Sequence, residues 1–240
     1  MSPLLALDRV EKSFGAVRAV DGVTLSVEAG VLLGVIGPNG AGKTTLFNLI
    51  GGDLRPDAGR IRLRDEDITH LSPHERCRRG IGRSYQIPHP FGGMTVFENL
   101  LVAATFGGRS RERAAYPICL EILESTGLSA KANRLAGALT LLDRKRLELA
   151  RALAVRPALL LLDEIAGGLT EGESAEVVAL IGRIKQRGVA MIWIEHIVHA
   201  LLSVADRLLV ISAGAAIAEG EPSEVMADPE VERVFLGIGA

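Results

Sequence analysis

The most constraining feature of this sequence is one glycine-rich segment that fits the pattern G-x-x-x-x-G-K-[ST]: Gly37-Pro38-Asn39-Gly40-Ala41-Gly42-Lys43-Thr44. The apolar run Val31–Ile36 before it predicts a buried strand, and Thr44–Ile50 after it predicts a helix. Glycines let backbone N–H groups approach phosphate oxygens, and the helix N-terminus adds partial positive charge. Lys43 can reach β- and γ-phosphates, and Thr44 can offer its hydroxyl to Mg²⁺. The segment therefore predicts a nucleotide phosphate site.

A second motif follows a second buried strand. Ala158–Leu162 is an uninterrupted apolar run, and Asp163 and Glu164 come directly after it. Because such a strand delivers a carboxylate to its polar end, Asp163 can hold Mg²⁺ through water. Glu164 can then polarise the attacking water as a general base. Acidic residues after a strand are ordinary alone, but together with the phosphate loop they predict nucleotide hydrolysis.

The rest of the sequence alternates between strand and helix patterns, with one helical interruption. Before the interruption, strands are expected over 31–36, 59–68 and 81–86, and within 4–30, where Gly15, Gly22 and Gly30 break them. From Met94 to about Val155 the periodicity is helical, with helices over 95–104 and 112–126. Afterwards we expect a strand at 158–162, a helix at 170–188, a strand at 191–194, a helix at 197–204, a hairpin at 208–217 and two helical turns. Thr170 and Glu173 predict a capping box.

This order predicts an α/β fold interrupted by an all-helical subdomain. We expect one domain over 1–240, with a nucleotide-binding core at about 1–88 and 156–240 and a helical subdomain at about 89–155. Lys and Arg number 27 against 29 Asp and Glu, and a net charge of −2 disfavours non-specific nucleic-acid binding. No apolar run is long enough to span a bilayer, and Met1–Asp8 does not resemble a signal peptide. Two cysteines exclude a disulfide framework and favour a reducing compartment.

Together these motifs resemble the ATP-binding-cassette (ABC) family, and the resemblance extends over essentially the whole chain. The loop from Gly37 to Thr45 resembles the phosphate-loop sequence of that family. The resemblance implies a P-loop NTPase fold, in which a RecA-like core with an antiparallel β subdomain is interrupted by an all-helical subdomain. It implies ATP and Mg²⁺ as cofactors, with ATP bound by the loop residues Asn39, Gly40, Ala41, Gly42, Lys43, Thr44 and Thr45.

The same resemblance implies roles for residues outside the loop. Phe14 sits where the family stacks an aromatic ring on adenine, and Ala19 is similar to the small residue beneath the base or ribose. Gln86 matches the Q-loop glutamine, which senses Mg²⁺ and the attacking water. His196 matches the switch histidine that contacts the γ-phosphate, so it joins Glu164 as an implied catalytic residue. The implied metal ligands are Thr44, Gln86 and Asp163.

Longer stretches resemble the ATPase subunits of branched-chain amino-acid importers. They are residues 81–86, 94–101, 146–153 and the tail from Asp228 to Gly237. This resemblance implies an ATP-hydrolysing subunit that powers import of branched-chain or other small hydrophobic amino acids. It implies two transmembrane permease subunits, a second ABC ATPase and a separate solute-binding protein as partners, with the chain peripheral at the cytoplasmic face of the cell membrane. We expect segment 86–94, which is rich in apolar and turn residues, to contact a membrane subunit.

One motif departs from the family pattern. The signature loop usually reads Leu-Ser-Gly-Gly-Gln and here reads Leu139-Thr140-Leu141-Leu142-Asp143. Thr140 and Asp143 keep the pattern of a helix N-cap, so Thr140 can still direct a helix N-terminus toward ATP bound to a partner. Leu142 replaces a glycine that allows close backbone approach, and Asp143 is expected to add negative charge near phosphate. We therefore expect a heterodimer with one better ATP site, while a homodimer stays open.

Alternative readings remain open at this point. An ATPase of the same superfamily that acts on DNA or ribosomes would need a basic face, a second cassette or a long coiled-coil insertion, and the sequence shows none of these. A poorly hydrolysing regulatory subunit of a heteromeric transporter would fit the altered loop, but Glu164 is retained. A structural zinc is not expected, because the two candidate groups supply too few ligands: His70 with His74 and Cys77, and His196 with His199.

Overall fold

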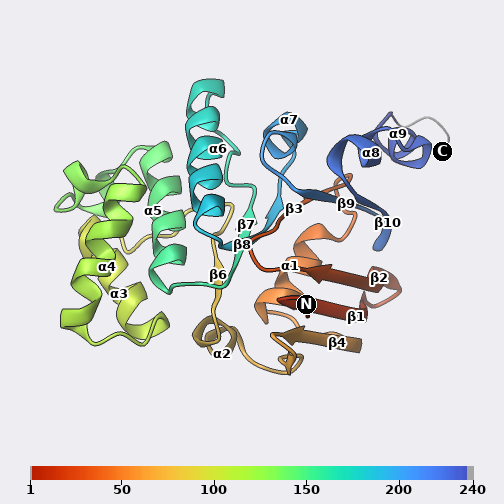
Figure 1. The fold of residues 1–240 in the computed structure, drawn as a ribbon, viewed down its shortest axis with the longest axis horizontal. Coiled ribbons are helices and arrows are strands. Elements are labelled where there is room, and N and C mark those ends of the chain that lie inside the picture. Colours follow the sequence, from red (N-terminus) through yellow and green to blue (C-terminus); the bar gives the residue numbers. More distant parts are fainter. Residues whose placement is uncertain (1, 237–240) are drawn as a thin grey trace.

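The computed structural model describes residues 2–236. Its strands are β1 (Leu5–Phe14), β2 (Val17–Val27), β3 (Leu32–Ile36), β4 (Ala58–Leu63), β5 (Glu66–Asp67), β6 (Ile81–Arg83), β7 (Leu159–Asp163), β8 (Ala190–Ile194), β9 (Arg207–Ser212) and β10 (Ala215–Gly220). They form an antiparallel sheet in the order β2-β1-β4-β5 and a larger sheet in the order β10-β9-β3-β8-β7-β6. The larger sheet is parallel except where β9 pairs with β10 (Figure 1).

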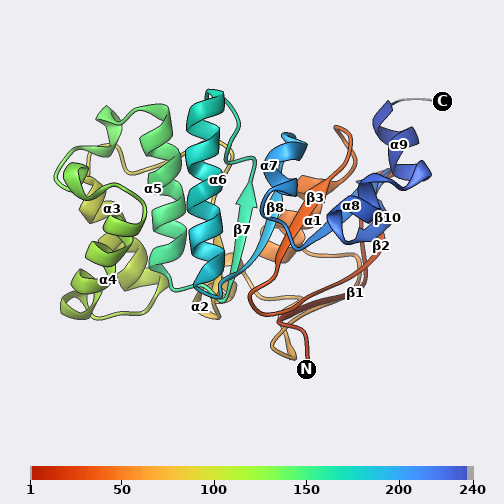
Figure 2. The same cartoon turned by 45° about the horizontal axis from the view of Figure 1, so that its top comes forward.

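The helices fall into a group that covers the sheets and a group set apart at one end of the molecule. Their bounds are α1 (Lys43–Gly51), α2 (Pro73–Arg78), α3 (Val96–Val102), the π-helical η1 (Ala103–Gly107), α4 (Glu112–Ser125), η2 (Ser129–Lys131), η3 (Ala136–Ala138), α5 (Leu141–Ala154), α6 (Glu171–Gln186), α7 (Val198–Leu202), α8 (Pro222–Met226) and α9 (Pro229–Leu236). Figures 1 and 2 show α3, α4 and α5 side by side, with α6 between them and β3. The chain enters this helical layer after β6 and leaves it before β7.

Buried apolar side chains gather in three clusters within residues 2–236. The first lies between the two sheets and includes Leu46 and Phe47 of α1. The second covers the other face of the larger sheet beneath α6 and α7 and contains Trp193, and the third joins α3, α4 and α5. Strands β3, β7 and β8 are buried along their whole length because both sheet faces are covered. This explains why their sequences are apolar runs rather than alternating patterns.

The observed elements follow the predicted order, with three differences. Gly22 does not break a strand, since β2 runs through it with a shift of register against β1. Residues 59–68 form the hairpin β4–β5 rather than one strand, because the chain turns at Arg64 and Asp65, both with positive φ. The strand expected over 81–86 ends at Arg83.

The structure also bears on the expected capping box, the subdomain boundaries and the C-terminal tail. The capping box is confirmed, since the Glu173 N–H donates to the Thr170 hydroxyl at 3.3 Å and the Thr170 N–H donates to the Glu173 carboxylate at 2.9 Å. The division of the chain near residues 88 and 156 stays a prediction. Gly237, part of the tail used above, lies outside the described residues. Within residues 2–236, no helix combines the length and apolar character needed to cross a bilayer.

A buried arginine ties α2 to the end of α1. The Arg76 guanidinium donates to the carbonyl oxygens of Leu49 and Ile50 in the last turn of α1, and to those of Thr69 and Leu71. The last carbonyls of a helix have no partner within the helix, so Arg76 satisfies groups that burial would otherwise leave unpaired. Burial lowers the pKa of Arg76 to about 10, yet these acceptors keep the cation in place.

Arg76→Met is expected to lower the free energy of unfolding by about 3 kcal/mol, because several buried carbonyls lose their donor at once. Urea denaturation would measure the loss. Arg79→Met is the matched control, since Arg79 sits on the same helix end with one side-chain partner, Glu66 at 2.8 Å, and should cost under about 1 kcal/mol. Equal losses in the two variants would contradict this role for Arg76.

Candidate active site

The phosphate loop joins β3 to α1 and is wedged against the antiparallel sheet. Gly42 has φ +104°, and a Cβ there would lie 2.1 Å from the carbonyl oxygen of Ala19 in β2, so only glycine fits. The Lys43 ammonium donates to the carbonyls of Gly37 at 2.7 Å and Pro38 at 2.9 Å, which closes the loop into a ring. The first N–H groups of α1 have no acceptor within the helix. The ring therefore presents N–H donors and a cation together, as an anion site requires.

A second group of side chains meets where the larger sheet ends. Glu164 follows β7, Gln86 lies in the loop after β6, and His196 lies in the loop after β8. The Gln86 side-chain amide donates to one carboxylate oxygen of Glu164, and His196 Nε2 lies 2.6 Å from the other. Because β6, β7 and β8 are adjacent and parallel, their carboxyl ends bring together three residues that are far apart in the sequence.

The phosphate loop and the acidic group are close enough to interact. Burial lowers the pKa of Lys43, while the charges of Glu164 and Asp163 oppose that shift. Asp163 is the last residue of β7, and burial raises its pKa although Arg83 Nη2 lies 3.5 Å away. A buried carboxylate whose pKa stays raised despite such a neighbour would be stabilised by a further nearby cation.

The oxygen donors expected for Mg²⁺ fit that ion. Asp163 supplies a carboxylate, Thr44 a hydroxyl in the first turn of α1, and Gln86 an amide oxygen, since its nitrogen is the atom that donates to Glu164. Mg²⁺ prefers oxygen ligands and takes few from protein, the others being water and phosphate. Within residues 2–236, no group of three or more His, Cys, Asp and Glu side chains could hold a metal ion.

The two residues expected near the adenine lie in the β1–β2 hairpin. Ala19 is brought against the phosphate loop by its contact with Gly42. Phe14 ends β1, pairs with Val17 across the hairpin, and leaves about half of its surface exposed. The Lys12 ammonium lies 5.8 Å from the centre of the Phe14 ring. The hairpin thus places an accessible aromatic ring on the same strand pair as Ala19.

Thr140 is not brought to this site, because it caps α5 within the helical layer. Its hydroxyl accepts from the Asp143 N–H at 3.3 Å and donates to the Asp143 carboxylate at 2.9 Å. The expectation that Asp143 adds negative charge near phosphate is wrong. The Asp143 side chain is buried and paired with Lys131 at 2.6 Å. Burial raises its pKa, but the hydrogen bonds from Lys131 and Thr140 outweigh burial, so the net shift is downward.

The two leucines of the altered loop have different surroundings. Leu142 packs against the second hydrophobic cluster, whereas Leu141 is the exposed residue at the N-terminus of α5. A Cβ on Gly168 would lie 3.5 Å from Leu141 Cδ2, so Leu141 sits beside the loop that follows Glu164. Of the two leucines, Leu141 is therefore the more exposed at the start of α5.

Sequence reasoning missed three charged residues that hold the site. Arg83 contacts Asp163, and the buried Glu195 carboxylate accepts from the N–H groups of Ala166 at 2.9 Å and His196 at 3.1 Å. Burial raises the pKa of Glu195. Lys145 on α5 is buried and bonds to backbone oxygens of the active-site loops. The sequence carried a signal for Lys145, which falls on the same helix face as Leu149, four residues later.

Comparison with known proteins decides the family. A model of the ABC transporter family matches residues 20–167. The chain is 38% identical to the high-affinity branched-chain amino acid transport ATP-binding protein BraF of Pseudomonas aeruginosa, over 98% of both chains. The chain belongs to the ABC transporter family. It is also 36% identical to LivG of Escherichia coli K12 over 98% of both chains, and 35% identical to the lipopolysaccharide export system ATP-binding protein LptB of Haemophilus influenzae over 98% of this chain and 97% of that one.

Solved structures agree with this assignment. The ADP conformation of an ATP-binding cassette of an ABC transporter superposes with a TM-score of 0.89 at 34% identity, over 99% of this chain and 100% of that chain. A nucleotide-free cassette gives a TM-score of 0.88 at 33% identity, with the same coverage. The predicted P-loop NTPase fold is confirmed, and so is the prediction that this ABC protein is an ATPase.

Asp163→Asn is expected to stabilise the fold, raising Tm by roughly 2–4 °C for each kcal/mol gained. In the wild-type protein, the folded-state pKa of Asp163 is raised above the ordinary 3.8, so its ionised carboxylate destabilises the native state at neutral pH. The gain in Tm should therefore shrink as pH falls through the raised pKa of the folded state and disappear below 3.8, where the folded and unfolded chains both hold the proton. Thermal unfolding across this pH range measures it.

Asp57→Asn is the matched control for that experiment. Hydrogen bonds from Lys12 and from the Ser13 N–H lower the pKa of the exposed Asp57, so its ionised form is the favoured one. This substitution should lower Tm at neutral pH. A lower Tm in Asp163→Asn as well would show that the Asp163 charge is compensated after all.

Proposed function

We propose that this chain hydrolyses ATP to power a membrane importer of branched-chain or other small hydrophobic amino acids. The observation that carries the hydrolytic role is the contact of Glu164 with both Gln86 and His196, beside a loop that presents Lys43. The names of the BraF and LivG relatives support the class of substrate. An assembled catalytic group disfavours a purely regulatory subunit, and the transporter family disfavours an ATPase that acts on DNA or ribosomes.

The chemistry of this site follows from its donors and acceptors. Lys43 and the N–H groups from Asn39 to Thr45 bind the β- and γ-phosphates, with the base of ATP against Phe14 and Ala19. Glu164 accepts a proton as a water oxygen bonds to the γ-phosphorus, and the bond from that phosphorus to the bridging oxygen breaks, which releases ADP and phosphate. His196 and Gln86 orient Glu164 for this transfer. Thr44, Gln86 and Asp163 would hold Mg²⁺, which when bound would neutralise phosphate charge.

A second ABC ATPase completes the site on this chain. Thr140 belongs to the surface that this chain would offer to ATP on its companion. Exposed Leu141 occupies the start of α5 there, where close backbone approach to phosphate needs a small residue. ATP on this chain would meet an ordinary signature loop on the companion, so a heterodimer with unequal sites is favoured over a homodimer.

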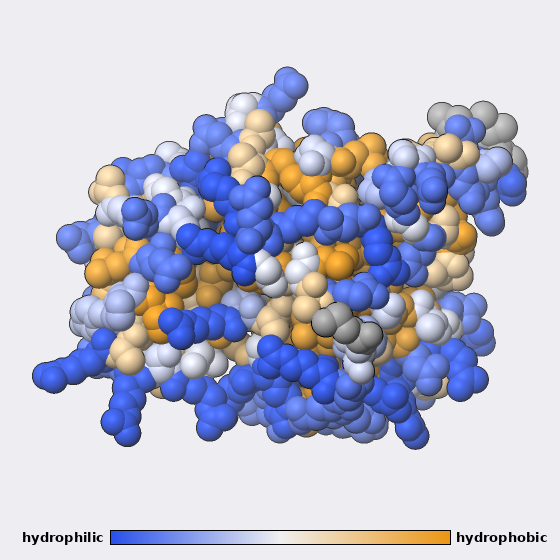
Figure 3. Space-filling view, viewed as in Figure 1, coloured by the Kyte–Doolittle hydropathy of each residue, from blue (hydrophilic) through white to orange (hydrophobic). Residues whose placement is uncertain are grey.

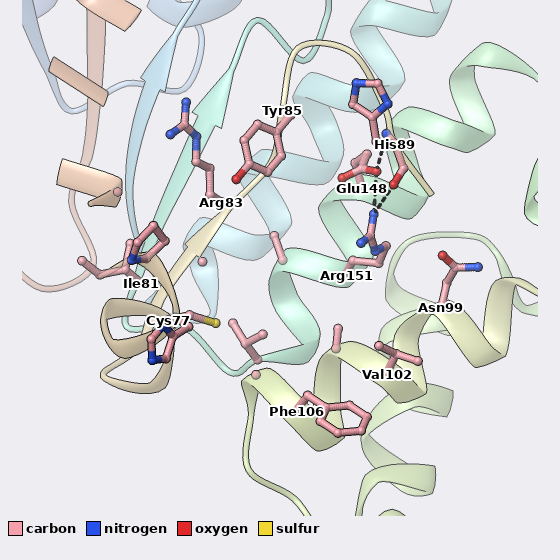
Figure 4. A pocket seen from close by; sticks show the side chains of 18 of the residues that line it. Cys77, Ile81, Arg83, Tyr85, His89, Asn99, Val102, Phe106, Glu148 and Arg151 are labelled. Carbon is pink, nitrogen blue, oxygen red and sulfur yellow. Dashed lines mark hydrogen bonds and ion pairs between the residues drawn. The ribbon is translucent and has the colours of Figure 1, made fainter. Parts of the chain in front are cut away.

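A cavity of about 550 Å³ between the α/β part and the helical layer is the proposed contact with the membrane subunits. Figure 4 shows Tyr85 and Arg83 on one side and Phe106 and Val102 on the other. Phe91, from the segment expected to contact a membrane subunit, also lines the cavity. Hydrophobic surface is exposed among hydrophilic side chains over the helical layer (Figure 3). Such exposed apolar surface around a cavity is typical of a protein contact.

The remaining partners and the location follow from the importer assignment. Two transmembrane permease subunits would each receive one ATPase, and a separate solute-binding protein would deliver the amino acid. The chain would lie on the cytoplasmic face of the cell membrane as a peripheral subunit. The identity of LptB at 35% makes export the competing direction, and uptake of a labelled amino acid by the reconstituted complex separates the two.

Glu164→Gln is expected to reduce hydrolysis to a small residual rate while ATP still binds, because the amide cannot accept the proton. In light scattering with ATP and Mg²⁺ this variant should stay monomeric alone and form a stable dimer with a companion ATPase that has an ordinary signature loop. The control is the double variant Glu164→Gln with Lys43→Met, which lacks the phosphate contact of Lys43. It should form no dimer, either with itself or with the companion ATPase. A stable homodimer of Glu164→Gln would show that the altered loop still serves as a signature.

Phe91→Ala and Phe106→Ala are expected to weaken binding to detergent-solubilised membrane subunits by about tenfold each, which corresponds to ~1.4 kcal/mol. Phe106 is 74% exposed and Phe91 47% exposed, so both rings are available to a partner. Phe235→Ala is the control, because Phe235 is a comparably exposed ring on α9, away from the cavity. Surface plasmon resonance gives the affinities, and unchanged binding in both cavity variants would refute this contact.

A further inference from the structure

One buried side chain joins the helical layer to the two loops that meet at the active site. Lys145 lies in the second turn of α5 and is 2% exposed. Its ammonium donates to the backbone oxygen of Gln86 at 2.6 Å and to that of Glu164 at 3.2 Å. These two residues follow different strands, β6 and β7. Lys145 is therefore a direct link between α5 and the backbone of both loops.

Charges around Lys145 explain why an ammonium is kept in so buried a place. Burial lowers the pKa of Lys145, and the charges of four carboxylates oppose that shift: Glu195, Glu164, Asp163 and Glu148. They come from the end of β8, the end of β7 and α5 itself. An apolar residue in place of Lys145 would remove a positive charge that these carboxylates favour and would leave two backbone carbonyls without their donor.

The backbone that Lys145 holds is an unfavourable one. Glu164 has φ +44°, a left-handed conformation that residues other than glycine rarely adopt. Its N–H donates to Ile194 O at 2.9 Å, and its carbonyl accepts from Gly167 N at 3.1 Å and from the Lys145 ammonium. The first two of these bonds join backbone groups, whereas the third comes from the Lys145 side chain on α5. The conformation it supports aims the Glu164 carboxylate at Gln86 and His196.

We propose that Lys145 is a positioning residue through which α5 sets the backbone of Gln86 and Glu164 for hydrolysis. The inference rests on the proposed role of Glu164 as general base. The exposed start of α5, at Leu141, faces the surface offered to the companion ATPase. A shift of α5 on engagement would therefore move both active-site loops together through one ammonium group.

The test compares Lys145→Met with Lys185→Met in the complex reconstituted with its companion ATPase and membrane subunits. Lys185 on α6 is a matched control, because its ammonium also donates to a backbone carbonyl, Val204 O at 2.8 Å, and pairs with Asp206, away from the site. Lys145→Met should lower kcat about thirtyfold, equivalent to ~2 kcal/mol, with ATP affinity within twofold. Lys145→Arg, which keeps charge and donors, should restore most of kcat, and Lys185→Met should leave both unchanged.

A double-mutant cycle separates positioning from a general loss of structure. In a Glu164→Gln background, Lys145→Met should not reduce the residual hydrolysis of radiolabelled ATP further, because both changes disable the same base. Losses that multiply, a kcat within threefold of wild type, or a parallel fall in ATP affinity would overturn the proposal. Should Lys145→Met not fold, Lys145→Gln carries the same comparison. Hydrolysis at close to the wild-type rate in Glu164→Gln alone would instead refute the assignment of the base.

Discussion

The hydrolysis proposed for this protein depends on one carboxylate held after β7 in a backbone conformation that its residue disfavours. Glu164 keeps φ +44° because its N–H and its carbonyl both find partners. The carboxylate that results lies against Gln86 and His196, which come from the loops on either side. A strained residue that its surroundings hold in place is a common form of pre-organisation at functional sites.

The parallel strands of the larger sheet bring the active-site loops together, and contacts from the antiparallel sheet hold the phosphate loop in place. Adjacent parallel strands end at the same edge of a sheet. The residues that follow β3, β6, β7 and β8 are therefore brought together by the strand order itself. The phosphate loop is then fixed from outside. Gly42 touches Ala19, the Gly214 N–H donates to Ala41 O at 2.9 Å, and the Asp21 N–H donates to Gly214 O at 2.8 Å. A substitution that moves the backbone of β2 or of the β9–β10 turn would therefore also move the phosphate loop, because the contacts between them are backbone contacts.

Local chemistry decided which parts of this arrangement could be predicted from sequence. The phosphate loop, Asp163 and Glu164 were predictable because each requires a short pattern next to a buried strand. The boundaries at Gly22 and after Arg83 were not, because a bulge and an early strand end depend on partners elsewhere in the sheet. Lys145 was missed for the same reason. Its two acceptors are backbone oxygens 59 and 19 residues away, and no side-chain pattern marks a backbone acceptor.

Asp143 shows how a correct local prediction can lead to a wrong electrostatic one. The sequence identified Thr140 as a helix cap, and the structure has that cap. The third helical residue of a capped helix turns back toward the cap, so the Asp143 carboxylate is directed to Thr140 and Lys131 rather than outward. Its charge is thereby neutralised inside the chain. In the proposed heterodimer, any weakness of this loop toward a companion's ATP would then come from the exposed bulk of Leu141 rather than from the charge of Asp143.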